Sequence, residues 1–292
     1  MKKTMLTALL LSLALLAGCA APGAASPTPT PELTESPETA ATLENDWVLT
    51  PCRIVDGAET GDLVLAGLED GCVYTLSVRA VKAVTMDGGS SGASELRDGM
   101  VIDVGHSGMI LETYPAQFAD PWTIGANSAG RDDRCGLYLR VLEDLWAVDP
   151  GLNEGITELG VDLSAVTGLS ESEKAAVAWV FGNAHGLMPV EGTLEELWEQ
   201  GYFTRMTEPA EGYADSLALY HWEDGCHFSI DTDEDAVWSL PMLAEGEESP
   251  ALTAFSAQKW RSGLGAYFFS DCTAAQAGDG TWTYAVGSEA IS

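Results

Sequence analysis

The first 46 residues most constrain what this 292-residue chain can fold into, because they are unsuited to a packed core. Lys2 and Lys3 precede an apolar run from Met5 to Leu16. This run has the length of a signal-peptide core and falls short of the roughly 20 residues that span a bilayer. Residues 20–46 are rich in Pro, Thr, Ser and Glu, which is typical of a disordered, extended spacer. We therefore expect a leader over residues 1–18, a tether over 19–46 and about 245 residues of folded protein.

The leader closes with Leu16-Ala17-Gly18-Cys19, which resembles the lipobox of bacterial lipoproteins. The resemblance implies transfer of a diacylglyceryl group to the Cys19 sulfur and cleavage between Gly18 and Cys19. Two or more acyl chains hold a protein stably at a bilayer, so the expected location is the extracytoplasmic face of the bacterial cell membrane. Membrane contact is then expected through the lipid at Cys19. The alternative is an ordinary secretory leader that happens to contain a cysteine.

The folded part carries a large negative charge. The chain has 13 Lys and Arg against 45 Asp and Glu, and removal of the leader takes away Lys2 and Lys3 and no acids, leaving 11 against 45 and a formal net charge of −34. Such a surface repels nucleic acid phosphates and anionic head groups. We therefore expect no nucleic acid partner. Solubility outside the cell explains the charge, and calcium binding or cationic partners are the alternatives.

Residues 47–127 form a first predicted module built from short strands. The runs between turn residues are typical of a small barrel or sandwich, and they lie at residues 52–55, 63–65, 73–78, 100–104 and 108–114. The segment 96–105 and the segment 108–117, which contains Glu112-Thr113-Tyr114-Pro115-Ala116-Gln117, resemble small OB-like domains of Firmicutes lipoproteins and secreted proteins, including the DUF3221 group. That resemblance implies an OB-like barrel and brings no catalytic residues with it.

Residues 130–292 form a second predicted module, in which helices come first. Apolar residues at three-and-four spacing predict a helix from Leu137 to Trp146, a strand is expected over 156–163, and capping boxes at Ser170-Glu171-Ser172-Glu173 and Thr193-Leu194-Glu195-Glu196 predict two more helices. Asp224-Gly225 predicts a hairpin between residues 216–222 and 226–231. Further strands are expected over 251–260, 264–274 and 281–286.

This order of elements predicts an α+β fold in which three helices pack on an antiparallel sheet. Two stretches of the module, the helix that follows Ser172 and residues 259–273, resemble a recurring uncharacterised module of clostridial proteins and lipoproteins. The resemblance supports a cell-envelope protein and implies no particular chemistry.

Five cysteines remain if Cys19 is lipidated. Among them Cys52 and Cys72 are a candidate disulfide, and the odd number leaves at least one free thiol unless a partner chain intervenes. The others are Cys135, Cys226 and Cys272. No pair or cluster has the spacing of a zinc site, so no metal is expected.

Several residues are candidates for a ligand-binding or metal-binding site. Lys259-Trp260-Arg261 is the most distinctive polar and aromatic run, and we expect any ligand pocket beside it. His221, Glu223 and Cys226 would share one face of the predicted hairpin, but ordinary polar residues explain them better. The stretch Asp231–Asp235 begins like a calcium loop but has Ala236 and Met242 where an EF-hand needs glycine and glutamate. His106, alone in a glycine-rich turn, is expected to be solvated.

Two function classes follow. The first is a non-enzymatic, membrane-anchored binding or interaction lipoprotein with a small-molecule or protein ligand and no cofactor. The second is an envelope enzyme that uses a cysteine and histidine pair of the second module. A reactive thiol of low pKa beside a histidine would favour the enzyme, and buried unreactive thiols would favour binding.

Overall fold

The computed structural model describes residues 47–211, 214–233 and 251–292. The predicted leader, the tether and Cys19 lie outside the described residues, as does the part of the acidic stretch Asp231–Asp235 from residue 234 onward. Residues 45–292 form one compact unit, to which both predicted modules belong. In the described ranges, no helix combines the length and the apolar character that a membrane crossing requires.

The first sheet is built from residues 48–126 and has the strand order β5-β4-β9-β6-β1-β2-β3-β8-β7. Its strands are β1 (Val48–Asp56), β2 (Asp62–Gly67), β3 (Val73–Ser77), β4 (Ala83–Met86), β5 (Gly89–Ser91), β6 (Val101–His106), β7 (Ile110–Leu111), β8 (Ala116–Phe118) and β9 (Thr123–Ala126). The five predicted strand regions are therefore confirmed. The run 108–114 yields only the two-residue strand β7.

The two halves of this sheet are joined by one stretch of chain. Strands β1, β2 and β3 form an antiparallel meander, and β6 pairs with the other side of β1. Strand β8 pairs in parallel with β3, and β9 pairs antiparallel with β6. Because β8 and β9 follow each other through residues 119–122, this segment links the β3 side of the sheet to the β6 side.

The described residues contain three α-helices, and the sequence predicts all three. They are α1 (Arg134–Ala147), α2 (Glu171–Ala184) and α3 (Leu194–Glu199). Both predicted capping boxes are present: Ser170 and Glu173 exchange the two bonds at the start of α2, and Thr193 and Glu196 do so at α3. Short 3-10 turns occur at η1 (Val78–Ala80), η2 (Ala93–Glu95), η3 (Pro150–Leu152) and η4 (Leu217–Leu219).

The second sheet makes the fold α+β, as expected, but it is mixed and not antiparallel throughout. Strand β10 is parallel to both β11 and β14, whereas β14, β15 and β16 are antiparallel neighbours. Because β10 and β11 are joined through α2, they form a crossover unit, whose strands are parallel. The strands are β10 (Glu158–Asp162), β11 (Pro189–Glu191), β12 (Thr204–Arg205), β13 (Tyr220–His221), β14 (Gly225–Thr232), β15 (Leu252–Ser262), β16 (Gly265–Gln276), β17 (Trp282–Ala285) and β18 (Ser288–Ile291).

The hairpin predicted at Asp224-Gly225 is wrong. Strand β14 pairs with β10 and β15, and the short strand β13 pairs with β12 and β15. Neither Asp224 nor Gly225 has the positive φ that the predicted turn needs. The glycine serves a different purpose, because a Cβ at Gly225 would lie 2.1 Å from the Trp222 ring. Close packing of this indole explains the glycine better than a turn does.

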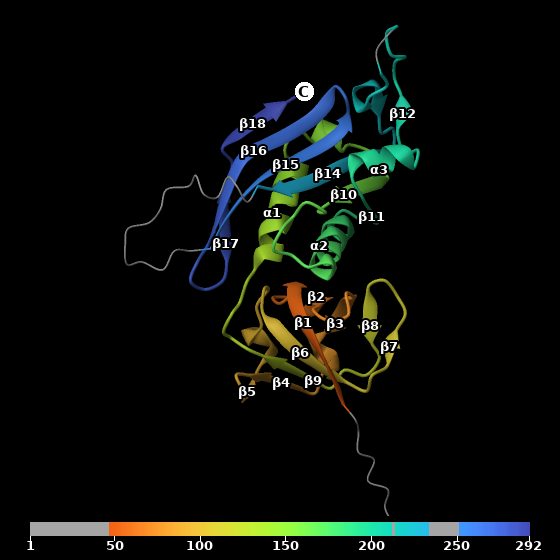
Figure 1. The fold of residues 1–292 in the computed structure, drawn as a ribbon. Coiled ribbons are helices and arrows are strands. Elements are labelled where there is room, and N and C mark those ends of the chain that lie inside the picture. The colour runs from red at the N-terminus through yellow and green to blue at the C-terminus, as the bar shows by residue number, and fades with distance from the viewer. Residues whose placement is uncertain (1–46, 212–213, 234–250) are drawn as a thin grey trace, which may run out of the picture. The chain divides into compact units, whose positions relative to one another are not determined.

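A single hydrophobic core joins the two predicted modules. Helix α2 contacts β1, β2 and β3 of the first sheet and β11 of the second, and Figure 1 shows α1 and α2 between the two sheets. The core cluster around these helices includes Val55, Val64, Ala66 and Val73 from β1 to β3, together with buried residues of β14, β15 and β16. The first sheet also has a separate core of its own. The modules therefore fold against each other and are not independent units on a linker.

Candidate functional site

Lys259 is a structural residue. Its side chain is fully buried, and its ammonium donates hydrogen bonds to the carbonyl oxygens of Val148 and Asp149 (3.1 Å) and to Oδ1 of Asn153 (2.8 Å). Burial lowers the pKa of Lys259 from its ordinary value. The carbonyls lie directly after the C-terminal end of α1, which is capped by Val148, and there the helix dipole favours a cation. All three N–H donors are used inside the protein.

Arg261 binds the same loop, whereas Trp260 packs elsewhere. The Arg261 guanidinium donates to the carbonyl oxygens of Leu152 (3.1 Å), Glu154 (3.0 Å) and Glu223 (2.9 Å). Trp260 is buried in a small aromatic core, with its ring 4.8 Å from that of Phe203. Lys259 and Arg261 therefore hold the loop after α1 on the sheet, and Trp260 belongs to the aromatic core. These contacts give the run a structural role, and the ligand pocket expected beside it stays a prediction.

The candidate disulfide partners lie on opposite sides of β2. Both are free cysteines in the structure; Cys52 is buried and Cys72 is exposed. Cys52 faces Gly67, and the Gly67 amide donates to the Cys72 carbonyl oxygen (2.8 Å). Because Gly67 lies between them, the Cα atoms of Cys52 and Cys72 are separated by two strand spacings, each of about 4.8 Å. This separation exceeds the roughly 7 Å over which a disulfide joins two Cα atoms. Closure of the predicted bond would require movement of the backbone.

The remaining thiols do not favour nucleophilic chemistry. Burial raises the pKa of Cys226 to about 12 and that of Cys272 to about 11, and it raises the pKa of Cys52 and Cys135 still further. A thiol with a raised pKa is a poor nucleophile at neutral pH. Cys226, the residue weighed with His221 and Glu223, is buried with its thiol toward the Trp260 carbonyl oxygen. None of these four cysteines therefore has the low thiol pKa that the enzyme alternative requires.

The four histidines are engaged elsewhere. His106 is buried, contrary to expectation, with Nε2 2.8 Å from the Thr50 hydroxyl. His185 stacks on Trp146 beside Glu143, His221 meets Glu223 at the surface (2.7 Å), and His227 donates to the Gly192 carbonyl oxygen (2.9 Å). Within the described ranges, no three His, Cys, Asp or Glu residues gather in a way that would hold a metal ion.

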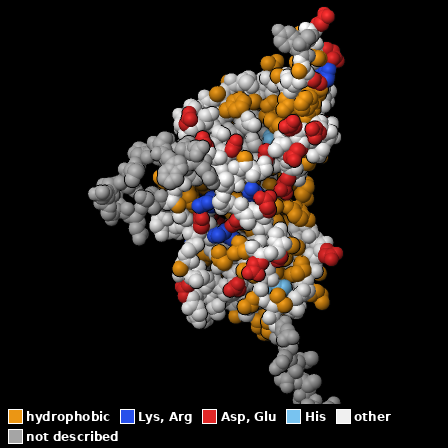
Figure 2. All heavy atoms as spheres, in the orientation of Figure 1, with side chains coloured by type: hydrophobic (Ala, Val, Ile, Leu, Met, Phe, Trp, Pro, Cys, Tyr) orange, Lys and Arg blue, Asp and Glu red, His pale blue; other side chains and the backbone are white. Residues whose placement is uncertain are grey.

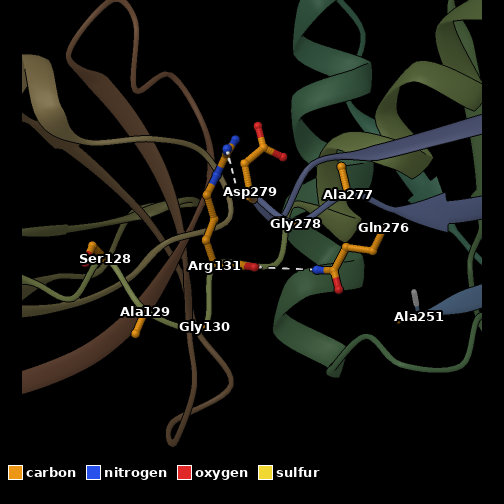
Figure 3. Close-up of a pocket in the computed structure, with 10 residues that line it drawn as sticks. Ser128, Ala129, Gly130, Arg131, Ala251, Gln276, Ala277, Gly278 and Asp279 are labelled. Carbon is orange, nitrogen blue, oxygen red and sulfur yellow. Dashed lines mark hydrogen bonds between the residues drawn. The ribbon is translucent and has the colours of Figure 1, made fainter. Parts of the chain in front are cut away.

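A first cavity, here called the linker cavity, has a volume of about 510 Å³ and is lined by residues 128–131, Ala251 and residues 276–280. Figure 3 shows Arg131 reaching toward Asp279 while its backbone carbonyl meets the Gln276 side chain. Arg131 donates to the carbonyl oxygens of Asp98 (2.7 Å) and Asp279 (3.2 Å). The Asp279 carboxylate in turn accepts from the Thr281 hydroxyl (2.7 Å). Because both charged side chains of this cavity make internal hydrogen bonds, they offer less to a ligand than unbonded groups would.

A second cavity, here called the α2 cavity, lies between the first sheet and α2 and has a volume of about 500 Å³. Its floor is a row of residues that are direct neighbours across four strands: Asp56 on β1, Val64 on β2, Thr75 on β3 and Gln117 on β8. A second row adds the cross-strand pair Asp62 and Ser77, and Leu63 and Leu76 complete the floor. Because neighbours across strands share one face, both rows point to the same side of the sheet.

The wall of the α2 cavity is the C-terminal half of α2. Trp179, Val180, Asn183 and Ala184 line it, and their spacing puts them on adjoining faces of the helix. The N-terminal half of α2 is attached directly to the first sheet, because Ser172 donates to the Gly67 carbonyl oxygen (2.7 Å) and Glu173 pairs with Arg53 (2.5 Å). The helix is thus fixed at one end and borders the cavity at the other.

The polar groups of the α2 cavity are free to bind a ligand. Among the described residues, no side-chain hydrogen bond or ion pair engages its polar side chains, which are Asp56, Asp62, Thr75, Ser77, Gln117 and Asn183. No Lys, Arg or His lines the cavity. A volume of this size and a mixture of apolar and unpaired polar groups are typical of small-molecule sites.

Fold and site together define an α+β protein with a cavity of mixed polar and apolar lining between the first sheet and α2. Comparison with protein-family models, with curated proteins and with solved structures gives no match. The family resemblance read from the sequence therefore stays a prediction.

The sequence analysis missed the α2 cavity. Its residues come from five elements, and no local motif joins them. A signal did exist: Asp62 and Ser77 at the ends of predicted strands, and Trp179 and Asn183 spaced four residues apart on one predicted helix. Pairing this helix with those strands requires the tertiary structure.

Proposed function

We propose that this protein is a non-enzymatic binding protein held at the extracytoplasmic face of the bacterial cell membrane by a lipid on Cys19, with a small-molecule ligand bound in the α2 cavity. The observation that carries the binding role is this cavity, whose six polar side chains lack partners within the described residues. Unpaired polar groups at the wall of a preformed cavity are what a ligand-binding site requires.

The proposal includes an OB-like barrel for the first module, as in the DUF3221 group. Three features support it: the meander β1-β2-β3, the parallel pairing of β8 with β3, and the pairing of β6 with both β1 and β9. If β8 and β9 count as one interrupted strand, these pairings make a closed ring. OB barrels commonly bind ligands on the face of their second and third strands, and β2 and β3 supply most of the cavity floor.

Membrane attachment is tested by metabolic labelling with palmitate in a bacterium that processes lipoproteins. Labelled lipid is expected in the wild-type protein, which should sediment with membranes, and neither is expected for Cys19→Ala. A wild-type chain without label, or a labelled Cys19→Ala variant, would overturn the anchoring.

Ligand binding is tested by thermal-shift screening of residues 20–292 against metals, sugars, amines, peptides and envelope fragments. A ligand at 100 times its dissociation constant stabilises the protein by about 2.7 kcal/mol. Hits are then repeated with Thr75→Trp, which fills the cavity, and with the exposed Arg79→Trp as a matched control. We expect the shift to disappear only with Thr75→Trp, and an unchanged shift in that variant would contradict the proposed site.

A further inference from the structure

We infer that the ligand of the α2 cavity is a neutral carbohydrate whose ring packs on the face of Trp179. This inference rests on the proposed function and specifies the ligand class for the same cavity. It depends on three properties of the site: a partly exposed tryptophan in its wall, a mixed set of hydrogen-bonding groups, and the negative charge of its lining.

Trp179 stands apart from the other tryptophans that the structure describes in helices and strands. Trp222 and Trp282 donate from Nε1 to Glu158 and Asp132 (2.6 Å each), and Trp146 stacks on His185. Trp179 packs partly against the core around α1 and α2 but makes no hydrogen bond or ring contact of this kind, and the rest of it is exposed in the lining of the cavity. An indole presents a large apolar face with a polar N–H at its edge. The C–H face of a sugar ring, bordered by hydroxyls, is complementary to such a group.

The hydrogen-bonding groups that line the cavity with Trp179 suit hydroxyls. Thr75, Ser77, Gln117 and Asn183 each offer both a donor and an acceptor, and the carboxylates of Asp56 and Asp62 accept only. A sugar hydroxyl donates one hydrogen bond and accepts others, so it pairs with either kind of group. A ligand with acceptors alone would leave the two carboxylates without donors, at a free-energy cost.

Charge narrows the class further. Two carboxylates and no cation line the cavity, in a chain of formal net charge −32, so anionic ligands such as phosphates or uronic acids are repelled. A purely apolar ligand would bury six polar side chains without partners. A cationic amine is the competing class, since it would also satisfy the carboxylates. It would make poor use of the four neutral polar side chains.

The site is preorganised for such a ligand. The shared core, the bond from Ser172 to Gly67 and the ion pair of Glu173 with Arg53 fix α2 against the sheet. A rigid site loses less conformational entropy on binding.

The test begins with residues 20–292 on an array of neutral, acidic and amino glycans, followed by calorimetric titration with the best neutral saccharide and with spermidine. We expect a neutral saccharide to bind, with a dissociation constant that changes less than about twofold between 50 and 500 mM NaCl, because salt screens only charged pairs. Trp179→Ala should weaken binding at least about tenfold and Trp179→Phe less. Trp47→Ala, which removes an exposed indole outside the cavity, should leave it unchanged.

The indole N–H signal of Trp179, assigned by its absence in Trp179→Phe, should shift on saturation in the wild-type protein. Binding of spermidine that weakens steeply with salt, without binding of any neutral glycan, would overturn the carbohydrate inference and leave the proposed binding function standing. Absence of binding to every glycan on the array would also overturn it. Neutral-glycan binding that is unaffected by Trp179→Ala would contradict the site.

Discussion

The most distinctive charged residues of the sequence, Lys259 and Arg261, stabilise the fold. Lys259 and Arg261 drew attention because cations are scarce in an acidic chain, but both bind backbone carbonyls of the loop after α1. The sequence pattern identified them as unusual and could not supply their partners, because Asp149 and Leu152 lie more than one hundred residues earlier in the chain. Because the partners of the buried Lys259 ammonium are neutral, its charge is stabilised only by these hydrogen bonds, and the loss of any one of them is costly.

Lys259→Met is expected to destabilise the protein by about 2–4 kcal/mol, because the carbonyls of Val148 and Asp149 and the Asn153 side chain lose their buried donor. The exposed Arg79→Met is the matched control and should change stability by no more than about 0.5 kcal/mol. Urea unfolding measures both. Equal stabilities for the two variants would show that the Lys259 bonds contribute nothing net.

Asp98 predicts a pH dependence at moderate acidity. Burial raises the pKa of Asp98 to about 6, despite the hydrogen bond from the Ala58 amide. The folded state therefore holds a proton that the unfolded state has released, so this contribution to stability is complete below about pH 4 and is lost as the pH rises through about 6. Asp98→Asn should flatten the stability profile between those values, by up to about 1 kcal/mol because the group is only half-buried. An unchanged profile would mean that Asp98 titrates normally.

At the scale of elements, the predictable features were those with local causes. The capping boxes of α2 and α3 and the apolar spacing of α1 depend on residues within a few positions of each other, and all three helices are confirmed. The hairpin at Asp224-Gly225 failed because a turn dipeptide is also a dipeptide that tolerates close packing, here by Trp222. The parallel pairing of β10 with β11 and β14 was not predicted, because the partners of a strand depend on contacts between segments that are distant in the sequence.

Helix α2 has a capping residue that also joins the helix to the first sheet. Glu173 accepts from the Ser170 amide (2.7 Å) and pairs with Arg53 of β1 (2.5 Å). Glu173→Gln should destabilise the protein by about 2 kcal/mol, because Arg53 is left partly buried without its counter-charge.

The control is Glu196→Gln in the capping box of α3, where the glutamate has no such ion pair among the described residues. An effect below about 1 kcal/mol is expected there, because glutamine can still accept the cap bond. Chemical denaturation of both variants provides the measurement. Similar losses at the two sites would reject a stabilising role for the Arg53 pair.

At the scale of the molecule, the acidic surface and the shared core have different causes. Figure 2 shows carboxylate side chains spread over the visible face, with few Lys and Arg side chains among them. The sequence predicted this charge and the α+β class. It also divided residues 47–292 into two modules. It could not predict that Val55, Val64 and Val73 of the first sheet belong to the core around α1 and α2 and not to the separate core of that sheet.

Because these residues share one core, we expect both sheets to unfold together. Scanning calorimetry of residues 20–292 should give a single transition, and Val64→Asp should lower its midpoint without dividing it. Two separate transitions in the wild-type protein would mean that the modules are independent and that the α2 cavity has no fixed wall.

The central claim is that a ligand binds between the first sheet and α2, and an amide NMR titration tests it most directly. With the strongest ligand from the thermal-shift screen, we expect the largest shifts on residues 62–64 and 75–77 of the floor and on residues 179–184 of the wall of the α2 cavity. Shifts confined to the linker cavity around Arg131, or scattered without relation to either wall, would contradict it.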